Sequence, residues 1–143
     1  FNEHPWKFLI SNNDEYRELF QSLLVEKNQQ WAQTAPVLGF MISRRHFEKN
    51  GKENRLHAFD TGAAWMAFTL EAREFNLYTH GMGGIKREEV HEKLNVPQDQ
   101  YEVHAGFALG PLAKPEQLDE SFQKSEKPNA RRPLSEVFHY GPL

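Results

Sequence analysis

The stretch from about Ala58 to Asn76 most constrains how this chain can fold. Its residues from Ala63 to Phe68 are apolar without a break, which predicts a helix that is apolar on every side. Such a helix belongs in a core or a subunit interface, not on a surface. Asn76 is expected to end it. The rest of the fold must therefore surround this helix.

Three segments predict strands. Residues 7–11 read as a short strand, and residues 37–42 are a continuous apolar run after a proline, which suits a strand buried on both faces. From residue 101 apolar and polar residues alternate, as in a strand with one apolar face. That face would carry Tyr101, Val103, Ala105, Phe107 and Leu109.

Helical spacing of apolar residues predicts an amphipathic helix over residues 14–27, with N-cap oxygens from Asn12, Asn13 and Asp14. A short charged helix is expected over residues 86–94. Residues 44–55 read as a solvated loop and residues 77–84 as an irregular connection. We therefore expect an α+β fold, with a mostly antiparallel sheet flanked by helices and a long central helix.

Composition narrows the class of protein. At 143 residues the chain fits a single domain over residues 1–143. A net charge of −3 without a basic block argues against a nucleic-acid partner. No stretch approaches the apolar length that a membrane span needs, and the first residues lack the order of a signal peptide. The absence of cysteine excludes disulfides and thiolate metal sites, and it is compatible with the cytoplasm.

The C-terminal part, residues 113–143, reads as an extended arm and not as a second domain. Residues 113–130 are mostly polar, with Leu118 and Phe122 as their large apolar side chains, which is also typical of a disordered tail. Apolar residues then return, and they would let the arm dock elsewhere: Leu134, Val137, Phe138 and Tyr140.

A glycine-rich turn, Gly81-Met82-Gly83-Gly84, lies between the long helix and the short charged one. Its spacing does not match the P-loop or the dinucleotide fingerprint. Glycine permits close approach of the backbone to a flat ligand, and the alternative is an ordinary tight turn before a helix.

Other classes of site lack their motifs. The histidines show no spacing of metal ligands, and no Gly-x-Ser-x-Gly elbow is present, so we expect neither a metal site nor a serine hydrolase. His57 and Asp60, one turn apart at the start of the long helix, are expected to cap it.

Three more segments are candidates for binding a ligand, each with a plainer alternative. Asn28 stands in Asn28-Gln29-Gln30-Trp31, and the alternative is a helix C-cap after Lys27. Asn2 opens Asn2-Glu3-His4-Pro5-Trp6, which is otherwise a frayed terminus. Arg131 and Arg132 precede Pro133, and paired arginines are commonly a solvated patch.

In order and spacing these segments together resemble the nitroreductase family of FMN-dependent oxidoreductases, from Asn2 to about Tyr140. The resemblance implies that Met82, Gly83 and Gly84 lie against the flavin, with the Gly83 amide facing ring nitrogen N5. Asn28 would hydrogen-bond the ring edge, and Asn2 matches the asparagine of the family's Asn-x-Gln-Pro-Trp motif. Arg131, with Arg132 in support, would hold the FMN phosphate.

The resemblance further implies an intertwined homodimer, with the arm of residues 113–143 crossing to the partner and FMN at the subunit interface. The expected activity is hydride transfer from NAD(P)H through FMN to nitroaromatics, quinones or related acceptors. The flavin carries that chemistry, so no catalytic acid, base or nucleophile of the protein is expected.

The chain also departs from the family. His4 replaces the glutamine of the motif, and Trp31 stands where many members carry a lysine near the flavin. The family's N-terminal segment, with its basic phosphate ligands, does not precede Phe1, so we expect an N-terminally truncated domain. The missing phosphate ligands and Trp31 favour the alternative, a non-catalytic protein that keeps the fold, has lost tight flavin binding and acts as a binding or structural module.

Overall fold

The computed structural model describes residues 2–11 and 13–142. They form two compact units, Phe1–Ala113 and Lys114–Leu143, each of which is described by itself. The first unit contains, in chain order, β1 (Trp6–Ile10), α1 (Asp14–Ser22), α2 (Glu26–Ala32), β2 (Val37–Arg44), α3 (His57–Glu74), β3 (Tyr78–Met82), α4 (Arg87–Lys93) and β4 (Tyr101–Gly110).

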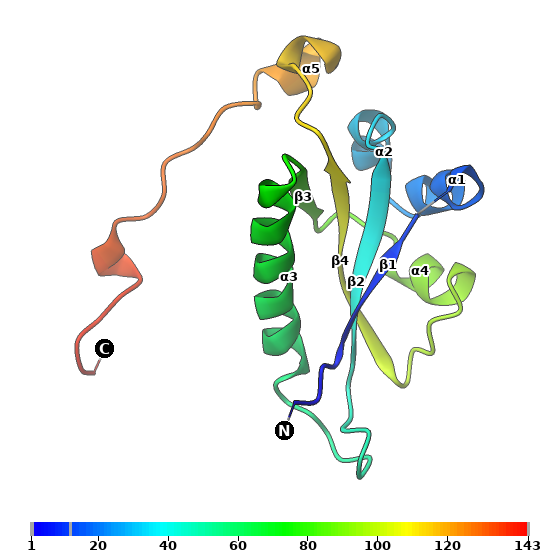
Figure 1. Cartoon of the computed structure of the whole chain (residues 1–143), viewed down its shortest axis with the longest axis vertical. Helices are drawn as coiled ribbons and strands as arrows, with labels where there is room; N and C mark the ends of the chain where they lie inside the picture. The colour runs from blue at the N-terminus through cyan, green and yellow to red at the C-terminus, as the bar shows by residue number, and fades with distance from the viewer. Residues whose placement is uncertain (1, 12, 143) are drawn as a thin grey trace. The chain divides into compact units, whose positions relative to one another are not determined.

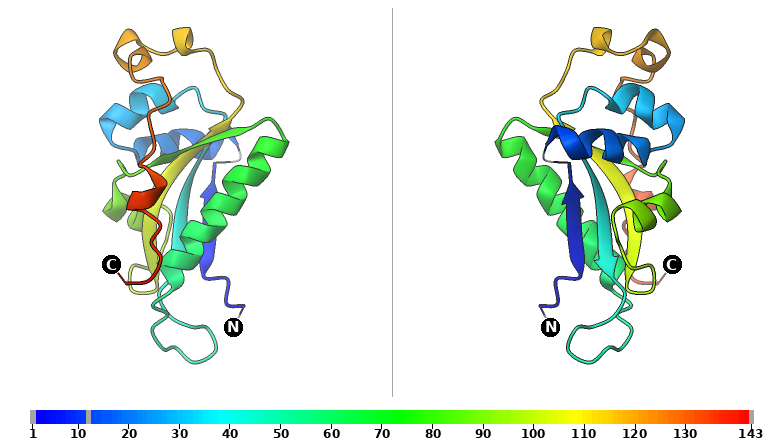
Figure 2. Two further views of the ribbon diagram at one scale, coloured as in Figure 1. Left: turned by 90° about the vertical axis from the view of Figure 1, so that its left-hand side faces the viewer. Right: turned by 90° about the vertical axis from the view of Figure 1, so that its right-hand side faces the viewer.

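The four strands form one antiparallel sheet in the order β1-β2-β4-β3. Helix α3 crosses one face of this sheet, and α1, α2 and α4 cover the other (Figures 1 and 2). The expected α+β fold, a mostly antiparallel sheet flanked by helices, is confirmed. Strand β2 is buried along nearly all of its length because helices cover both faces, as its continuous apolar run predicted.

Aromatic rings fill the layer between α3 and the sheet. Phe68 of α3 lies 5.1 Å from Phe8 of β1 and 5.5 Å from Phe107 of β4, measured between ring centroids. Trp65 lies 5.5 Å from Phe107. The Phe107 ring covers Gly39, its register partner on β2, where a Cβ atom would come within 2.2 Å of the ring. Glycine at position 39 therefore leaves the space that this ring occupies over β2.

The opposite face of the sheet carries the main aliphatic core. Leu38, Phe40 and Ile42 of β2 are buried there against α1, α2 and α4. Val90 of α4 and Leu24, after α1, complete this layer, and both are fully buried. Burial of side chains of this kind contributes about 1.5–3 kcal/mol each.

The prediction that β4 carries all its apolar residues on one face is wrong. The pairing with β2 shifts between Met41 and Ile42, which face Ala105 and Val103, so that His104 is the additional residue of a β-bulge. Val103 belongs to the aliphatic core, whereas Phe107 lies on the α3 face. Because a bulge exchanges the two faces beyond it, period-two counting from Tyr101 fails after residue 103.

The single helix predicted over residues 14–27 is also wrong. Asn13 caps α1 as expected, accepting a hydrogen bond from the Tyr16 amide at 3.0 Å, while Asn12 lies outside the described residues. The helix ends because Leu24 pairs with Ile85 in an isolated β-bridge. Tertiary pairing to the turn after β3 therefore interrupts the helical pattern, and α2 begins at Glu26.

The connection predicted over residues 77–84 is mostly a strand. Residues 78–82 pair with β4 as the edge strand β3, so only the turn that follows is irregular. The stop predicted at Asn76 is confirmed, since this residue adopts a left-handed backbone with φ 56°. The short helix α4 is also confirmed, and Asn95, with φ 52°, follows its end.

The second unit has little regular structure. It contains the 3₁₀ turns η1 (Pro115–Gln117) and η2 (Leu134–Glu136) and the short helix α5 (Glu120–Gln123). Its returning apolar side chains are exposed, with Tyr140 at 94%. Among the described residues no helix is both long and apolar enough to span a bilayer.

Candidate functional site

Asn28 and the glycine turn, far apart in sequence, meet in the structure. The Asn28 side-chain Nδ2 donates to the carbonyl oxygen of Gly84 at 2.9 Å. The Val25 amide donates to the same oxygen at 3.1 Å. Asn28 lies inside α2, so it is not the C-cap of a helix that ends at Lys27. The fold thus joins two of the candidate flavin-binding segments at one place, which we call the Asn28–Gly84 site.

The two glycines of this turn have different surroundings. A Cβ atom on Gly84 would lie 2.8 Å from both Asn28 Nδ2 and Val25 Cγ2, so position 84 has no room for a side chain. A Cβ atom on Gly83 would meet nothing within 4 Å, and Gly83 is exposed. The turn therefore presents bare backbone to open space on one side while it packs against α2 on the other.

Trp31 extends the Asn28–Gly84 site along α2. Its indole Nε1 donates to Asn28 Oδ1 at 3.3 Å, and its ring lies 4.6 Å from that of His80 on β3. The half-buried tryptophan therefore orients the Asn28 amide, and it supplies no positive charge where many family members have one.

The Asn28 side chain keeps capacity for a ligand. A primary amide has two N–H donors and two acceptor lone pairs. One donor is used by Gly84 and one lone pair by Trp31, so one of each remains. A flat ligand edge that carries both a carbonyl and an imide N–H needs this combination. The residues present at the Asn28–Gly84 site therefore fit an isoalloxazine ring.

The other candidate residues of the first unit are placed differently. The Met82 side chain is buried in the aliphatic core, so only its backbone can face a ligand. Asn2 is exposed with φ 55° at the opposite edge of the sheet, because β1 and β3 are the two edge strands. Three strand spacings separate these edges, about 14 Å. Asn2 and the Asn28–Gly84 site are not brought together within one chain.

Arg131 and Arg132 belong to the second unit, and both are exposed. The Arg131 guanidinium bonds locally, with Nη1 3.1 Å from Asn129 Oδ1 and 3.3 Å from its carbonyl oxygen. Both contacts come from Nη1, so the Nε and Nη2 donors of Arg131 keep the fork that suits a phosphate.

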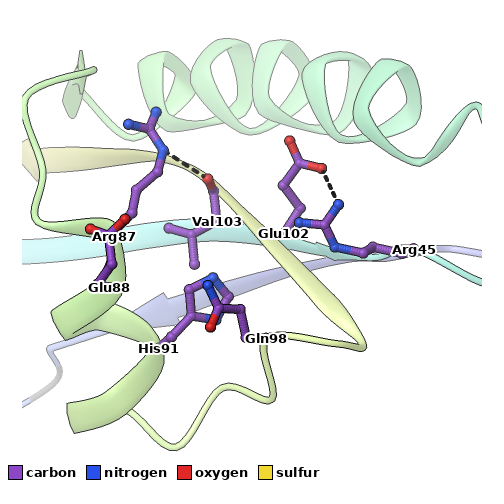
Figure 3. A pocket seen from close by; sticks show the side chains of 7 residues that line it. All are labelled: Arg45, Arg87, Glu88, His91, Gln98, Glu102 and Val103. Atoms are coloured by element: carbon purple, nitrogen blue, oxygen red, sulfur yellow. Dashed lines mark hydrogen bonds and ion pairs between the residues drawn. The ribbon is translucent and has the colours of Figure 1, made fainter.

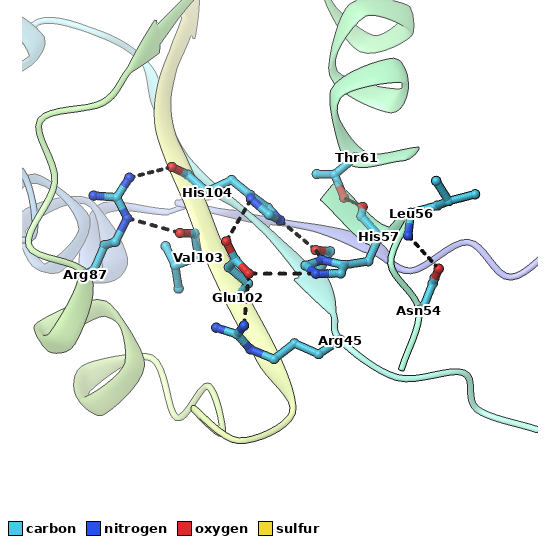
Figure 4. A network of polar contacts seen from close by, with 10 residues as sticks. Arg45, Asn54, Leu56, His57, Thr61, Arg87, Glu102, Val103 and His104 are labelled. Atoms are coloured by element: carbon cyan, nitrogen blue, oxygen red, sulfur yellow. Dashed lines mark hydrogen bonds and ion pairs between the residues drawn. The ribbon is translucent and has the colours of Figure 1, made fainter. Parts of the chain in front are cut away.

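A polar cluster that sequence reasoning missed lies at the start of α3 (Figure 4). Ser43 of β2, which is fully buried, places its Oγ 2.7 Å from His57 Nδ1 and 2.6 Å from His104 Nε2. Glu102 faces the outer nitrogens of both rings, 3.8 Å from His57 Nε2 and 3.9 Å from His104 Nδ1. Arg45 Nη1 holds Glu102 Oε2 at 3.0 Å. We call these residues the Ser43 cluster.

The chain places His57 in this cluster through the turn before α3. Asn54 is buried, and its Oδ1 accepts from the Leu56 amide at 3.1 Å, while its carbonyl oxygen accepts from the His57 amide at 3.2 Å. The prediction that His57 and Asp60 cap α3 is wrong, because the N-cap, Leu56, carries no side-chain hydrogen bond. The imidazole of His57 turns toward the sheet instead.

Burial lowers the pKa of His104, and the Glu102 carboxylate opposes that shift. Electrostatic interaction with His57, Arg45 and Arg87 adds to the lowering of this pKa. His104 is therefore held toward its neutral form. No sequence motif could reveal the cluster, since its members come from β2 and the residue after it, from α3 and from β4. Glu102 is the register partner of Ser43, and His104, two residues further on, contacts the same serine.

An open pocket of about 270 Å³ lies between α4 and β4. Its lining residues are Arg45, Arg87, Glu88, His91, Gln98, Glu102 and Val103 (Figure 3). Arg87 donates from Nε to the Val103 carbonyl at 3.2 Å and from Nη2 to the His104 carbonyl at 2.9 Å. Arg87 thus satisfies the backbone of β4 where β3 no longer pairs with it, and none of the candidate flavin-binding residues lines this pocket.

No group of three or more histidine, cysteine or acidic side chains that could hold a metal ion is found in the part of the chain that the structure describes.

The family model and the solved structures that match this chain point to the same family. The model of the Nitroreductase family matches residues 1–111. A solved structure described as an oxidoreductase containing FMN is 38% identical, with a TM-score of 0.93, over 99% of this chain and 73% of that one. A search of the curated proteins found no match.

More distant structures share the fold. A protein from Exiguobacterium sibiricum, solved in complex with FMN, is 15% identical with a TM-score of 0.75, over 98% of this chain and 78% of its own. A nitroreductase family protein from Clostridium difficile is 20% identical with a TM-score of 0.69, over 99% of this chain and 77% of its own.

Proposed function

The chain belongs to the nitroreductase family, and from that premise we propose that it is an FMN-dependent oxidoreductase that uses NAD(P)H to reduce nitroaromatics, quinones or related acceptors. The observation that carries this proposal is the Asn28–Gly84 contact beside the open, side-chain-free Gly83. It combines a free donor and acceptor pair with a bare backbone surface, as the edge and the face of a flat ring require.

When bound, FMN would supply the redox chemistry by accepting hydride and passing electrons to the acceptor. The protein's part is to bind and to orient. Asn28 would hydrogen-bond the ring edge through its spare amide groups, and the backbone of Met82, Gly83 and Gly84 would lie against the ring. The Gly83 amide would donate to the reacting nitrogen, where a fixed donor stabilises developing charge.

We propose that the complete site needs two chains. Asn2 lies at the opposite sheet edge from the Asn28–Gly84 site, so it can reach a flavin only at a site of the partner chain. Arg131, with Arg132, would hold the phosphate from the arm of residues 113–143, which we propose crosses to the partner. A chain without cysteine is compatible with a place in the cytoplasm.

The outer face of α3 supports a homodimer. Phe59, Met66 and Leu70 are 74%, 56% and 60% exposed, and Ala63 and Ala67 between them are also exposed. Trp65 and Phe68 of the same helix pack against the sheet of their own chain, so they are not part of this outer face. A second copy covering this face would remove a large apolar patch from water.

The second candidate is a protein of the same fold that has lost tight flavin binding and acts as a binding or structural module. Trp31 favours it, because this position lacks the positive charge that would stabilise reduced, anionic flavin.

The visible absorption spectrum of the purified protein tests the two candidates. Flavin bands in the preparation, or after incubation with FMN and removal of free ligand, with oxidation of NADH or NADPH in the presence of a quinone, are expected for the oxidoreductase. A preparation that stays colourless after incubation would contradict this proposal and favour the second candidate. The Asn28→Ala variant, with Gln30→Ala as an exposed control on the same helix, locates the binding site.

A further inference from the structure

The bridging hydroxyl of the Ser43 cluster limits how many protons the cluster can hold. Ser43 Oγ lies within hydrogen-bond distance of an imidazole nitrogen on each side, at 2.7 and 2.6 Å. A hydroxyl has one proton, so it can donate to only one of the two rings. The other ring must donate its own N–H to Oγ. The ring that accepts from Ser43 must therefore be a neutral imidazole.

His104 is the ring that the surroundings select as the acceptor. Burial disfavours its charged form, and the Arg87 guanidinium on its carbonyl oxygen adds a positive charge nearby. Ser43 then donates to His104 Nε2, and the proton of the neutral His104 ring resides on Nδ1, which faces Glu102. His57 completes this chain of hydrogen bonds by donating from Nδ1 to Ser43.

The Ser43 cluster can take up one further proton without losing either hydrogen bond to Ser43. His57 Nε2 is unprotonated in the neutral cluster, and it faces Glu102 Oε2 at 3.8 Å. Arg45 holds the same carboxylate oxygen at 3.0 Å. A proton on His57 Nε2 therefore replaces a lone pair facing a carboxylate by an N–H facing it, while both hydrogen bonds to Ser43 remain.

A second added proton cannot bind without breaking a hydrogen bond to Ser43. It would have to occupy His104 Nε2, the atom that accepts the Ser43 hydroxyl proton. Two imidazolium rings would then direct N–H groups at one oxygen, with ring centroids 5.8 Å apart and with Arg45 and Arg87 as further cations nearby. Glu102 is the anion that faces both rings, and one carboxylate balances one added proton.

We propose that the Ser43 cluster is a pH-sensitive contact between the start of α3 and the sheet, which accepts one proton without change and breaks when a second proton is added. His57 is the first residue of α3, and Ser43 and His104 belong to β2 and β4. Loss of the bridge therefore releases the first turn of α3 from both strands. That turn begins the helix whose apolar outer face includes Phe59.

Imidazole ¹⁵N spectra of the full chain test this, recorded from about pH 8 to about pH 4.5, with His57→Gln and His104→Gln to assign the signals. We expect His104 to stay the neutral Nδ1–H tautomer when the first proton is added to the cluster. We also expect amide exchange in the first turn of α3, corrected for its intrinsic pH dependence, to become about two- to tenfold faster only when His104 protonates, the size expected for one lost hydrogen bond.

Ser43→Ala provides the matched variant. Without the hydroxyl His104 Nε2 no longer accepts its proton, so His104 should lose its fixed Nδ1–H tautomer, and exchange in the first turn should be fast at every pH. If that variant fails to fold, the spectra of the parent chain still decide. Both imidazoles titrating together, or His104 in the Nε2–H tautomer at neutral pH, would overturn the proposal. Unchanged exchange across the protonation of His104 would overturn it as well.

Discussion

The side-chain amide of Asn28 and the carbonyl oxygen of Gly84 are 2.9 Å apart, and their hydrogen bond connects α2 with the turn that follows β3. The same turn is held by backbone bonds from Val25 to Gly84 and from Lys86 to Leu23, at 3.1 and 2.9 Å. The proposed ring-binding surface is therefore fixed by the fold. Substitutions at Gly83 and Gly84 can test its open side and its packed side separately.

Gly83→Val should abolish flavin binding while leaving the fold nearly intact. The new side chain would project into space that is empty in the chain itself, so the unfolding temperature should change little. It would occupy the volume that we assign to the flavin ring. The measurement is flavin absorbance per chain, with thermal unfolding of the apoprotein beside it. Equal flavin occupancy in variant and parent would rule out the proposed site.

Gly84→Val is the contrasting variant. Its Cβ atom would lie 2.8 Å from Asn28 Nδ2 and Val25 Cγ2, so the side chain must displace α2 or the turn. We expect a loss of stability of about 1–3 kcal/mol, typical of overpacking, together with weaker flavin binding. If both glycine variants lose flavin and stability to the same extent, the argument from open space at Gly83 fails.

The pattern of apolar residues predicted the secondary structure well where no tertiary pairing overrides the local pattern. The apolar run of β2 is buried along nearly all of its length, and the apolar stretch of α3 forms a helix with one face against the sheet, so the local pattern and the secondary structure agree. Period counting failed at the bulge of β4 and at the end of α1. There a cross-strand shift at His104 and a bridge between Leu24 and Ile85 override the local pattern.

The candidate site was predictable to a smaller extent. Asn28 and the glycine turn were found through the family resemblance, and the fold brings them into contact. The Ser43 cluster was not found, because its residues share no motif and meet only after three elements have packed. Asn54, which positions His57, looked like part of an ordinary solvated loop.

Leu70→Glu should convert the proposed homodimer into a monomer. Leu70 is 60% exposed on the outer face of α3, where we place the partner. Burial of one leucine is worth about 2 kcal/mol, and a symmetric interface loses it twice, about thirtyfold in the dissociation constant each time. Size-exclusion chromatography with light scattering measures the change.

Tyr16→Glu is the control for that experiment. Tyr16 is 44% exposed on α1, which covers the other face of the sheet, so its variant should remain a dimer. A parent chain that is a stable monomer at micromolar concentration would contradict the dimer altogether.

Stability should fall in acid partly because of His104. Its pKa is lowered in the folded state from the ordinary 6.5, so the unfolded chain binds more protons as the pH decreases. The stabilisation is therefore fully present above about pH 6.5 and is lost as the pH falls through the lower value of the folded state. His104→Gln should show a flatter dependence of the unfolding temperature on pH in this window.

His139→Gln, which replaces an exposed histidine in the second unit, is the matched control for the pH measurement. A His104→Gln variant with the full slope of the parent would show that another group causes the acid sensitivity.

Arg131→Ala should weaken the binding of FMN by about ten- to a hundredfold. A charge-assisted hydrogen bond to phosphate contributes about 1.5–3 kcal/mol, which corresponds to that range. Riboflavin lacks the phosphate, so its affinity should hardly change. Fluorescence titration of both ligands separates the phosphate contact from a general loss of structure, and Lys127→Ala, an exposed cation of the same arm, controls for net charge. If both affinities fall together, Arg131 supports the fold and does not bind phosphate; if neither falls, the phosphate is held by other residues.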